Sequence, residues 1–183
     1  MSKPRQQSSG LSNTPKRQPS RKKPAQSSAD HSAKEQQAVA LINQGKLQEA
    51  EAIYRELITA GTSNHIVYGN LAALCGMQGR FEELIELLKT ALQLKPNFPE
   101  AHNSLGNAFK AKGDLSAAIV SYNKALQLKP SFPEAYNNLG VIHRREGNPE
   151  AAIGCFEKAL RGTEREREKE REKPIESDTQ RWR

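Results

Sequence analysis

The hydrophobic and polar positions of this chain recur at a fixed interval. Four glycines lie 34 residues apart, and the residues around each glycine follow the same order of sizes. Leucine precedes the glycine by eight residues in three of the four copies, a small residue comes next, and a large residue follows nine positions after the glycine. These positions are Gly45, Gly79, Gly113 and Gly147; Leu71, Leu105 and Leu139; Ala38, Ala72, Gly106 and Gly140; and Tyr54, Leu88, Tyr122 and Phe156. Such a period predicts stacked copies of one structural unit, each of which buries its apolar face against its neighbours.

Each unit is predicted to contain two helices, because apolar residues recur at helical spacing both before and after its glycine. The glycine suits the positive φ of the position that follows a helix. Asp114 and Asn148 are expected to cap the helices that come next, and Pro149 fits the first turn of the last of them. The units, called one to four below, are about 31–64, 65–98, 99–132 and 133–166.

Units three and four carry the motifs Ala101-His102-Asn103-Ser104-Leu105-Gly106 and Ala135-Tyr136-Asn137-Asn138-Leu139-Gly140. On these residues, and on the Pro130 that closes unit three, the chain resembles tetratricopeptide-repeat (TPR) proteins over about residues 34–161. Unit one departs from the pattern with Gln37 in place of the leucine, as a terminal repeat would. The resemblance implies an all-α, right-handed solenoid of about four helix-turn-helix repeats, with the first helix of each pair on the concave side.

The two ends of the chain differ from the array in composition. Residues 1–34 hold eight Lys or Arg and one Asp, whereas residues 35–162 and 163–183 each balance their charges, so the whole net charge of +7 lies in the N-terminal segment. We expect residues 1–33 to be a disordered basic arm, residues 34–162 to be the array, and residues 163–183 to be a disordered, charged tail of low complexity. No segment of the sequence is long and apolar enough for a leader or a membrane span.

The tail begins with strict alternation of acidic and basic residues from Glu164 to Lys173. A GA dinucleotide tract encodes such a Glu-Arg alternation. One hypothesis is therefore that the chain ends early in a simple-sequence tract and that a longer array or an appended domain is missing. The alternative is a natural charged tail that extends the last helix into solvent. Varied codons across 164–173, with no repeat-like frame downstream, would contradict the first hypothesis.

The sequence contains no catalytic constellation, no spacing typical of metal ligands and no phosphate-binding glycine loop, so we predict neither enzyme activity nor a cofactor. The candidate binding surface is the concave face that the TPR resemblance implies, where another protein would place a peptide segment. The resemblance assigns to this face Asn70, Asn103, Ser104, Asn107, Lys110, Asn137, Asn138, Val141, Arg144 and Arg145.

Asn70, Ser104 and Asn138 lie 34 residues apart and form a row that the serine interrupts. Side-chain amides in a row can bind both the N–H and the C=O of an extended peptide. The row is similar to the asparagine ladder in the TPR superhelix of O-linked N-acetylglucosamine transferases and their bacterial relatives. This similarity adds an alternative function, the substrate-recruiting region of a truncated transferase. Another interpretation is that these residues are merely polar positions on a solvated face.

The basic arm suggests a third function. Lys16, Arg17, Arg21, Lys22 and Lys23 could contact RNA, another polyanion or an anionic membrane surface, or act as a nuclear import signal. No aromatic residue lies among these charges, so sequence-specific base stacking is not expected. A solubilising role is the plainer alternative. We expect a cytoplasmic protein, or a nuclear one if the host has a nucleus, and the sequence leaves the oligomeric state and the partner open.

Overall fold

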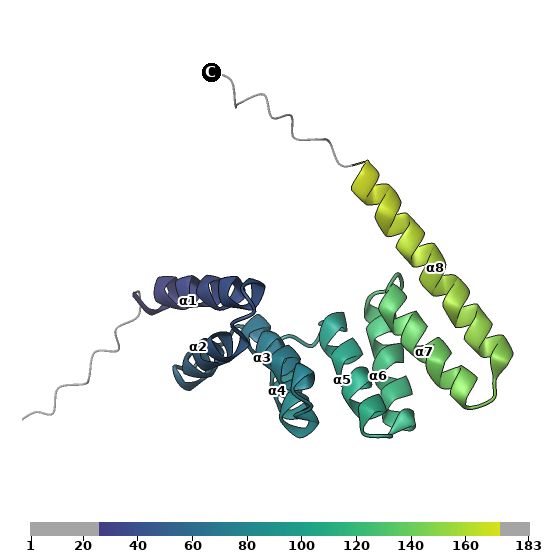
Figure 1. Ribbon diagram of the computed structural model, residues 1–183, viewed down its shortest axis with the longest axis horizontal. Coiled ribbons are helices and arrows are strands. Elements are labelled where there is room, and N and C mark those ends of the chain that lie inside the picture. Colours follow the sequence, from purple (N-terminus) through teal and green to yellow (C-terminus); the bar gives the residue numbers. More distant parts are fainter. Residues whose placement is uncertain (1–25, 173–183) are drawn as a thin grey trace, which may run out of the picture.

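The structure, a computed structural model, describes residues 26–172, which form eight helices and no strand. The helices pair into four hairpins that follow one another along a curved row (Figure 1), so the all-α solenoid expected from the sequence is confirmed. They are α1 (Gln26–Asn43), α2 (Leu47–Thr59), α3 (His65–Met77), α4 (Phe81–Leu94), α5 (Pro99–Ala111), α6 (Leu115–Leu128), α7 (Pro133–Arg145) and α8 (Pro149–Arg171).

The periodic glycines end the first helix of every hairpin, as predicted. The φ angles of Gly45, Gly79, Gly113 and Gly147 are +74°, +73°, +83° and +78°, in the left-handed region that a side chain disfavours. Of the two predicted caps, Asp114 is confirmed, because its Oδ1 accepts a hydrogen bond of 3.0 Å from the backbone N–H of Ala117. The cap predicted at Asn148 is wrong, since its side chain makes no such bond.

Both ends of the array are helical further out than we expected. Helix α1 begins at Gln26, so residues 26–33, which we assigned to the disordered arm, are helical; residues 1–25 lie outside the described part. Helix α8 continues to Arg171, so residues 163–171 of the charged tail extend the last helix, which is one of the alternatives considered for this segment. Extending an existing helix is much easier than nucleating one, and Glu, Arg and Lys have high helix propensity.

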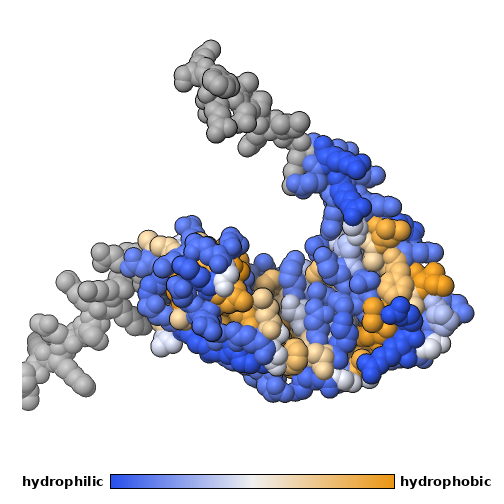
Figure 2. Space-filling view, in the orientation of Figure 1, coloured by the Kyte–Doolittle hydropathy of each residue, from blue (hydrophilic) through white to orange (hydrophobic). Residues whose placement is uncertain are grey.

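The first helices of neighbouring units line the inner side of the row. Helix α3 packs close to α5 and α5 close to α7, whereas among residues 26–172 no two neighbouring second helices approach as closely, although the side chains of Arg55 on α2 and Glu83 on α4 pair. Because the first helices lie closer together, the row curves toward them. In the space-filling view, α1 and the charged half of α8 rise on two sides of a hollow (Figure 2).

Within units three and four, a glycine lets the two helices approach closely. A Cβ atom added to Gly106 would lie 2.5 Å from Cε1 of Tyr122, and one added to Gly140 would lie 2.6 Å from Cε1 of Phe156. Tyr122 is fully buried. The small residue and the large residue that recur in the sequence are therefore packing partners, and in these two units a glycine faces an aromatic ring.

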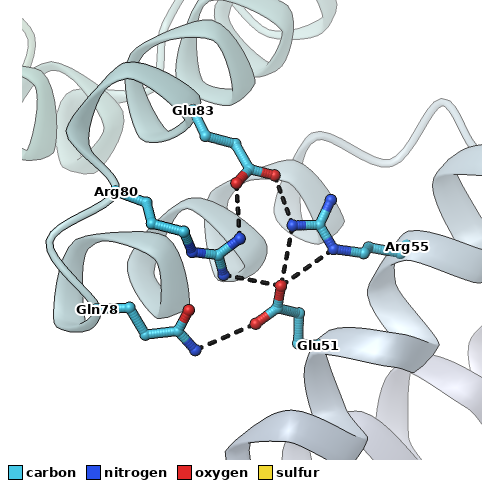
Figure 3. Close-up of polar contacts among 5 residues, drawn as sticks. All are labelled: Glu51, Arg55, Gln78, Arg80 and Glu83. Carbon is cyan, nitrogen blue, oxygen red and sulfur yellow. Dashed lines mark hydrogen bonds and ion pairs between the residues drawn. The ribbon is translucent and has the colours of Figure 1, made fainter.

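A polar cluster joins units one and two beside the apolar core that these units share (Figure 3). Glu51 on α2 stands at the repeat position that Ile85, Ile119 and Ile153 occupy in the later units. Its Oε1 accepts from Arg80 at 2.7 Å, and it also accepts from Arg55 of its own helix at 2.9 Å. The Glu51 side chain is only 16% exposed, so these bonds compensate for the loss of water.

Three further contacts complete this cluster. Gln78 donates to Oε2 of Glu51 at 3.1 Å, and Glu83 pairs with both Arg55 and Arg80 at 2.6 Å. Burial raises the pKa of Glu51, but the hydrogen bonds from Arg80, Arg55 and Gln78 outweigh it and hold the pKa below its ordinary value. The carboxylate therefore stays ionised at neutral pH, and the cluster carries two negative and two positive side chains.

Candidate functional site

Two pockets open on the inner side of the first half of the row. The first has a volume of about 300 Å³ and lies between α1 and α3. The second has a volume of about 350 Å³ and lies between α3 and α5. Both are lined by Ile66 and Asn70, so the two pockets lie next to each other across three first helices, and together they are called the groove below. The other lining residues are Glu35, Gln36, Val39, Tyr54 and Val67 in the first pocket and Gly69, Leu88, Phe98, Glu100, Ala101 and Ser104 in the second.

Asn70 is fixed at the floor of this groove by a buried tyrosine. Its Nδ2 donates a hydrogen bond of 3.1 Å to the hydroxyl of Tyr54, which is fully buried. Burial raises the pKa of Tyr54, although the bond from Asn70 opposes this shift. The phenol stays protonated, and Oδ1 of Asn70 remains available for a donor from the groove.

A second tyrosine–asparagine pair lies in unit three. The hydroxyl of Tyr122 donates to Oδ1 of Asn107 at 2.7 Å. Burial strongly raises the pKa of Tyr122, so its proton is retained and the bond persists at all ordinary pH values. Asn107 is otherwise exposed, with its Nδ2 left for other acceptors. In both pairs a second helix supplies the tyrosine and a first helix supplies the asparagine.

Lys110 on α5 and Asn138 on α7 link units three and four on the same side of the row. Nζ of Lys110 donates to Oδ1 of Asn138 at 2.6 Å and lies 6.0 Å from the centre of the Tyr122 ring. Burial lowers the pKa of Lys110. No carboxylate pairs with this half-buried ammonium group in the part of the chain that the structure describes, so this part of the face is basic.

The remaining predicted residues differ in their exposure and in whether they line a pocket. Ser104 lines the second pocket beside Asn70, and Val141 is half-buried on α7. Asn137, Arg144 and Arg145 are exposed on α7 and are not brought into either pocket. Asn103 is half-buried and points its Oδ1 into the protein, where it has no hydrogen-bond partner. The structure thus gathers Asn70 and Ser104 at one place and Lys110 with Asn138 at another.

The prediction from sequence missed the apolar part of the groove. Val39 and Ile66 are 44% and 48% exposed there, and Phe98 reaches the second pocket from the turn before α5. One signal in the sequence could have revealed Ile66: the same repeat position holds Ser32, Glu100 and Glu134 in the other units. An isoleucine at a repeat position that is polar in the other units indicates a role other than packing in the core.

The structure adds little on the basic arm, on metal binding and on membrane insertion. The basic residues Lys16, Arg17, Arg21, Lys22 and Lys23 lie outside the described residues. In residues 26–172, no group of three His, Cys, Asp or Glu side chains is placed to hold a metal ion. No helix in that range has the length and apolar character needed to cross a membrane.

Comparisons with known proteins agree with this geometry. A family model described as "TPR repeat" matches residues 77–113 and 106–147, and one described as "Tetratricopeptide repeat" matches residues 134–168. The chain is 28% identical over 85 residues to the Hsp70-Hsp90 organizing protein of Triticum aestivum, a match that covers 46% of this chain and 15% of that relative. The chain thus spans only a small part of the relative's length.

Two solved structures have a similar fold. The protein MamA superposes with a TM-score of 0.69 at 22% identity, over 76% of this chain and 81% of its own. YrrB, described as a TPR protein with an unusual peptide-binding site, gives a TM-score of 0.63 at 21% identity, over 74% of this chain and 70% of its own. At these identities the likeness concerns the fold alone. None of these matches supports the transferase alternative.

Proposed function

The chain belongs to the tetratricopeptide-repeat family, and from that premise we propose that its inner groove binds an extended peptide segment of a partner protein. The family matches support a protein-interaction scaffold in general terms. The observation that carries the finer proposal is the pair of adjacent pockets over α1, α3 and α5, in which Val39 and Ile66 leave apolar surface open to solvent. A few apolar side chains of a peptide would cover this surface.

Polar groups in the groove and further along the inner side, on α7, suit a peptide backbone. Asn70 uses its N–H group on Tyr54 and keeps a carbonyl oxygen, which can accept from a peptide N–H. Asn138 uses its carbonyl oxygen on Lys110 and keeps its N–H groups, which can donate to a peptide C=O. An extended strand offers both groups in alternation, so the two amides can hold the backbone while the pockets select side chains.

The test is a screen of a synthetic peptide array against the full chain, followed by titration of the best peptide by fluorescence polarisation. Ile66→Glu should abolish or strongly weaken binding, because it places a charge in both pockets. The variant should fold, since units three and four carry Glu100 and Glu134 at this repeat position. Asn70→Ala and Asn138→Ala should weaken binding of every selected peptide to a similar degree.

Met77→Arg is the matched control. Met77 is 69% exposed and lines neither pocket, and unit four carries Arg145 at the same repeat position. It should bind like the unaltered protein. The proposal fails if no peptide binds, or if selected peptides bind Ile66→Glu as tightly as the unaltered chain.

A further inference from the structure

The last helix exposes an apolar stripe. In the earlier units the first helix of the next unit packs over the equivalent stripe, and such a contact between two units is called a joint below. Ile153 and Leu160 on α8 are 57% and 60% exposed. At the same repeat positions, Ile85 is 7% exposed and Ile119 is half-buried, because the next first helix packs against α4 and α6. Figure 2 shows apolar surface along the first half of α8, before the charged half begins. This stripe therefore has the residues of a joint, but no further helix among the described residues packs against it.

The first helix exposes the other side of the same joint. Ala33 and Ala40 lie on α1, seven residues apart, and both are exposed. The residues at these repeat positions in α3, α5 and α7 are all buried, and each of these helices packs against the second helix of the preceding unit. They are Val67 and Leu74, Ala101 and Ala108, and Ala135 and Ile142. Helix α1 has no preceding unit among the described residues, so its outward side stays open.

The two open sides resemble an inner joint that the chain already builds. Helix α5 packs on α4, and Ala101 and Ala108 of α5 are buried. Helix α1 offers Ala33 and Ala40, the same residue types at the same spacing. Alanines allow a close approach of the two helices, into which isoleucine and leucine side chains of the facing helix can pack.

We propose that a second copy of this chain stacks head to tail on the first, with α1 of one copy on α8 of the other, in the geometry of the joint between α4 and α5. Each joint buries Ile153 and Leu160 against Ala33 and Ala40 of the next copy. The contact is heterologous, so it leaves one open side at each end of the assembly, which grows with concentration as a row.

A two-fold pairing of α8 with itself fits the charges less well. Glu150, Glu157 and Glu164 are exposed and lie at intervals of seven residues beside the apolar stripe. In an isologous contact the same surface meets its own copy, which would bring this column of carboxylates close to its equivalent. Like charges in such a contact destabilise it. On α1, Gln37 lies between the two alanines and adds no charge to the joint.

The test is the mass of the full chain in solution, measured by sedimentation velocity over a range of concentrations. The unaltered protein should rise above its monomer mass of 20.3 kDa as its concentration increases. A variant with Ile153→Glu and Leu160→Glu blocks the contact surface on α8, and the variant Ala40→Arg blocks the contact surface on α1. Each variant alone should stay at the monomer mass, and a mixture of the two should form a complex of one copy of each.

Two controls keep the result interpretable. Val120→Glu replaces a residue on α6 that is 69% exposed, at a repeat position where α4 carries Glu86, and it should assemble like the unaltered protein. Circular dichroism checks that every variant is folded; Ile153→Glu should be, since α2 holds Glu51 at that repeat position. The proposal is overturned if the unaltered chain stays monomeric, if Ala40→Arg alone still dimerises, or if the mixture of blocked variants remains monomeric.

Discussion

Replacing Gly106 by alanine should destabilise the array, although the same change usually stabilises a helix. In a helix interior alanine is favoured over glycine by about 1 kcal/mol. At Gly106, however, the new methyl group would lie 2.5, 2.6 and 2.8 Å from three ring atoms of Tyr122. That ring is fully buried and its hydroxyl is bonded to Asn107, so it has little freedom to move away.

The expected size of the effect follows from these two opposing terms. Overpacking by one methyl group in a close-packed core costs about 1–3 kcal/mol. After the gain in helix propensity of about 1 kcal/mol, the net loss is up to about 2 kcal/mol. Unit one combines Ala38 with Tyr54, both fully buried, so the clash in unit three comes from the helix spacing there as well as from the pair of residue types.

The measurement is chemical denaturation followed by circular dichroism, with Gly154→Ala as the matched control. Gly154 lies within α8, and a Cβ atom at this position would meet nothing within 4 Å. This control should raise the denaturation midpoint, because it keeps the gain in propensity without the clash. The reasoning would be refuted if Gly106→Ala raised the midpoint as much as Gly154→Ala does.

Two further predictions concern single side chains. Asp114→Ala should lower the free energy of unfolding by about 1 kcal/mol, because it removes the cap on Ala117. Asn148→Ala should change it much less, because Asn148 makes no capping bond; equal losses in denaturation experiments would contradict this. The lowered pKa of Glu51 should make the array less stable in acid. Its contribution is complete above the ordinary value of 4.5 and is lost as the pH falls through the lower value in the folded state. In acid titrations followed by circular dichroism, Glu51→Gln should remove part of this dependence, and an unchanged titration curve would count against the role of the cluster with Arg80.

The sequence predicted the repeat because its signal is local and occurs several times. Gly113 needs a positive φ whatever surrounds it, and the stripe around Leu105 repeats at helical spacing, so chance agreement is small. The helix ends were harder to predict. Gln26 and Arg171 lie where a helix extends beyond its packed part, and the boundary there depends on propagation, which leaves no sharp residue pattern.

The candidate site was predicted only in its polar part. Asn70 and Ser104 were found because they recur with the period, and they do line one pocket. Ile66 and Phe98 were missed, since an apolar residue in a helical repeat is first assigned to the core. The pairing of Glu51 with Arg80 was also missed, because the two are 29 residues apart and no pattern of residue types specifies which charges meet.

The polar cluster between units one and two makes this joint different from those that follow. Dissolved ions weaken attraction between partly exposed charges far more than they weaken apolar contacts. The contact between the first hairpin and its neighbour should therefore weaken more than the later contacts as the ionic strength rises, although the shared apolar core stays in place. Any segment that occupies the space between α1 and α3 bridges this joint. Its dissociation rate should vary with salt even when the segment itself is uncharged.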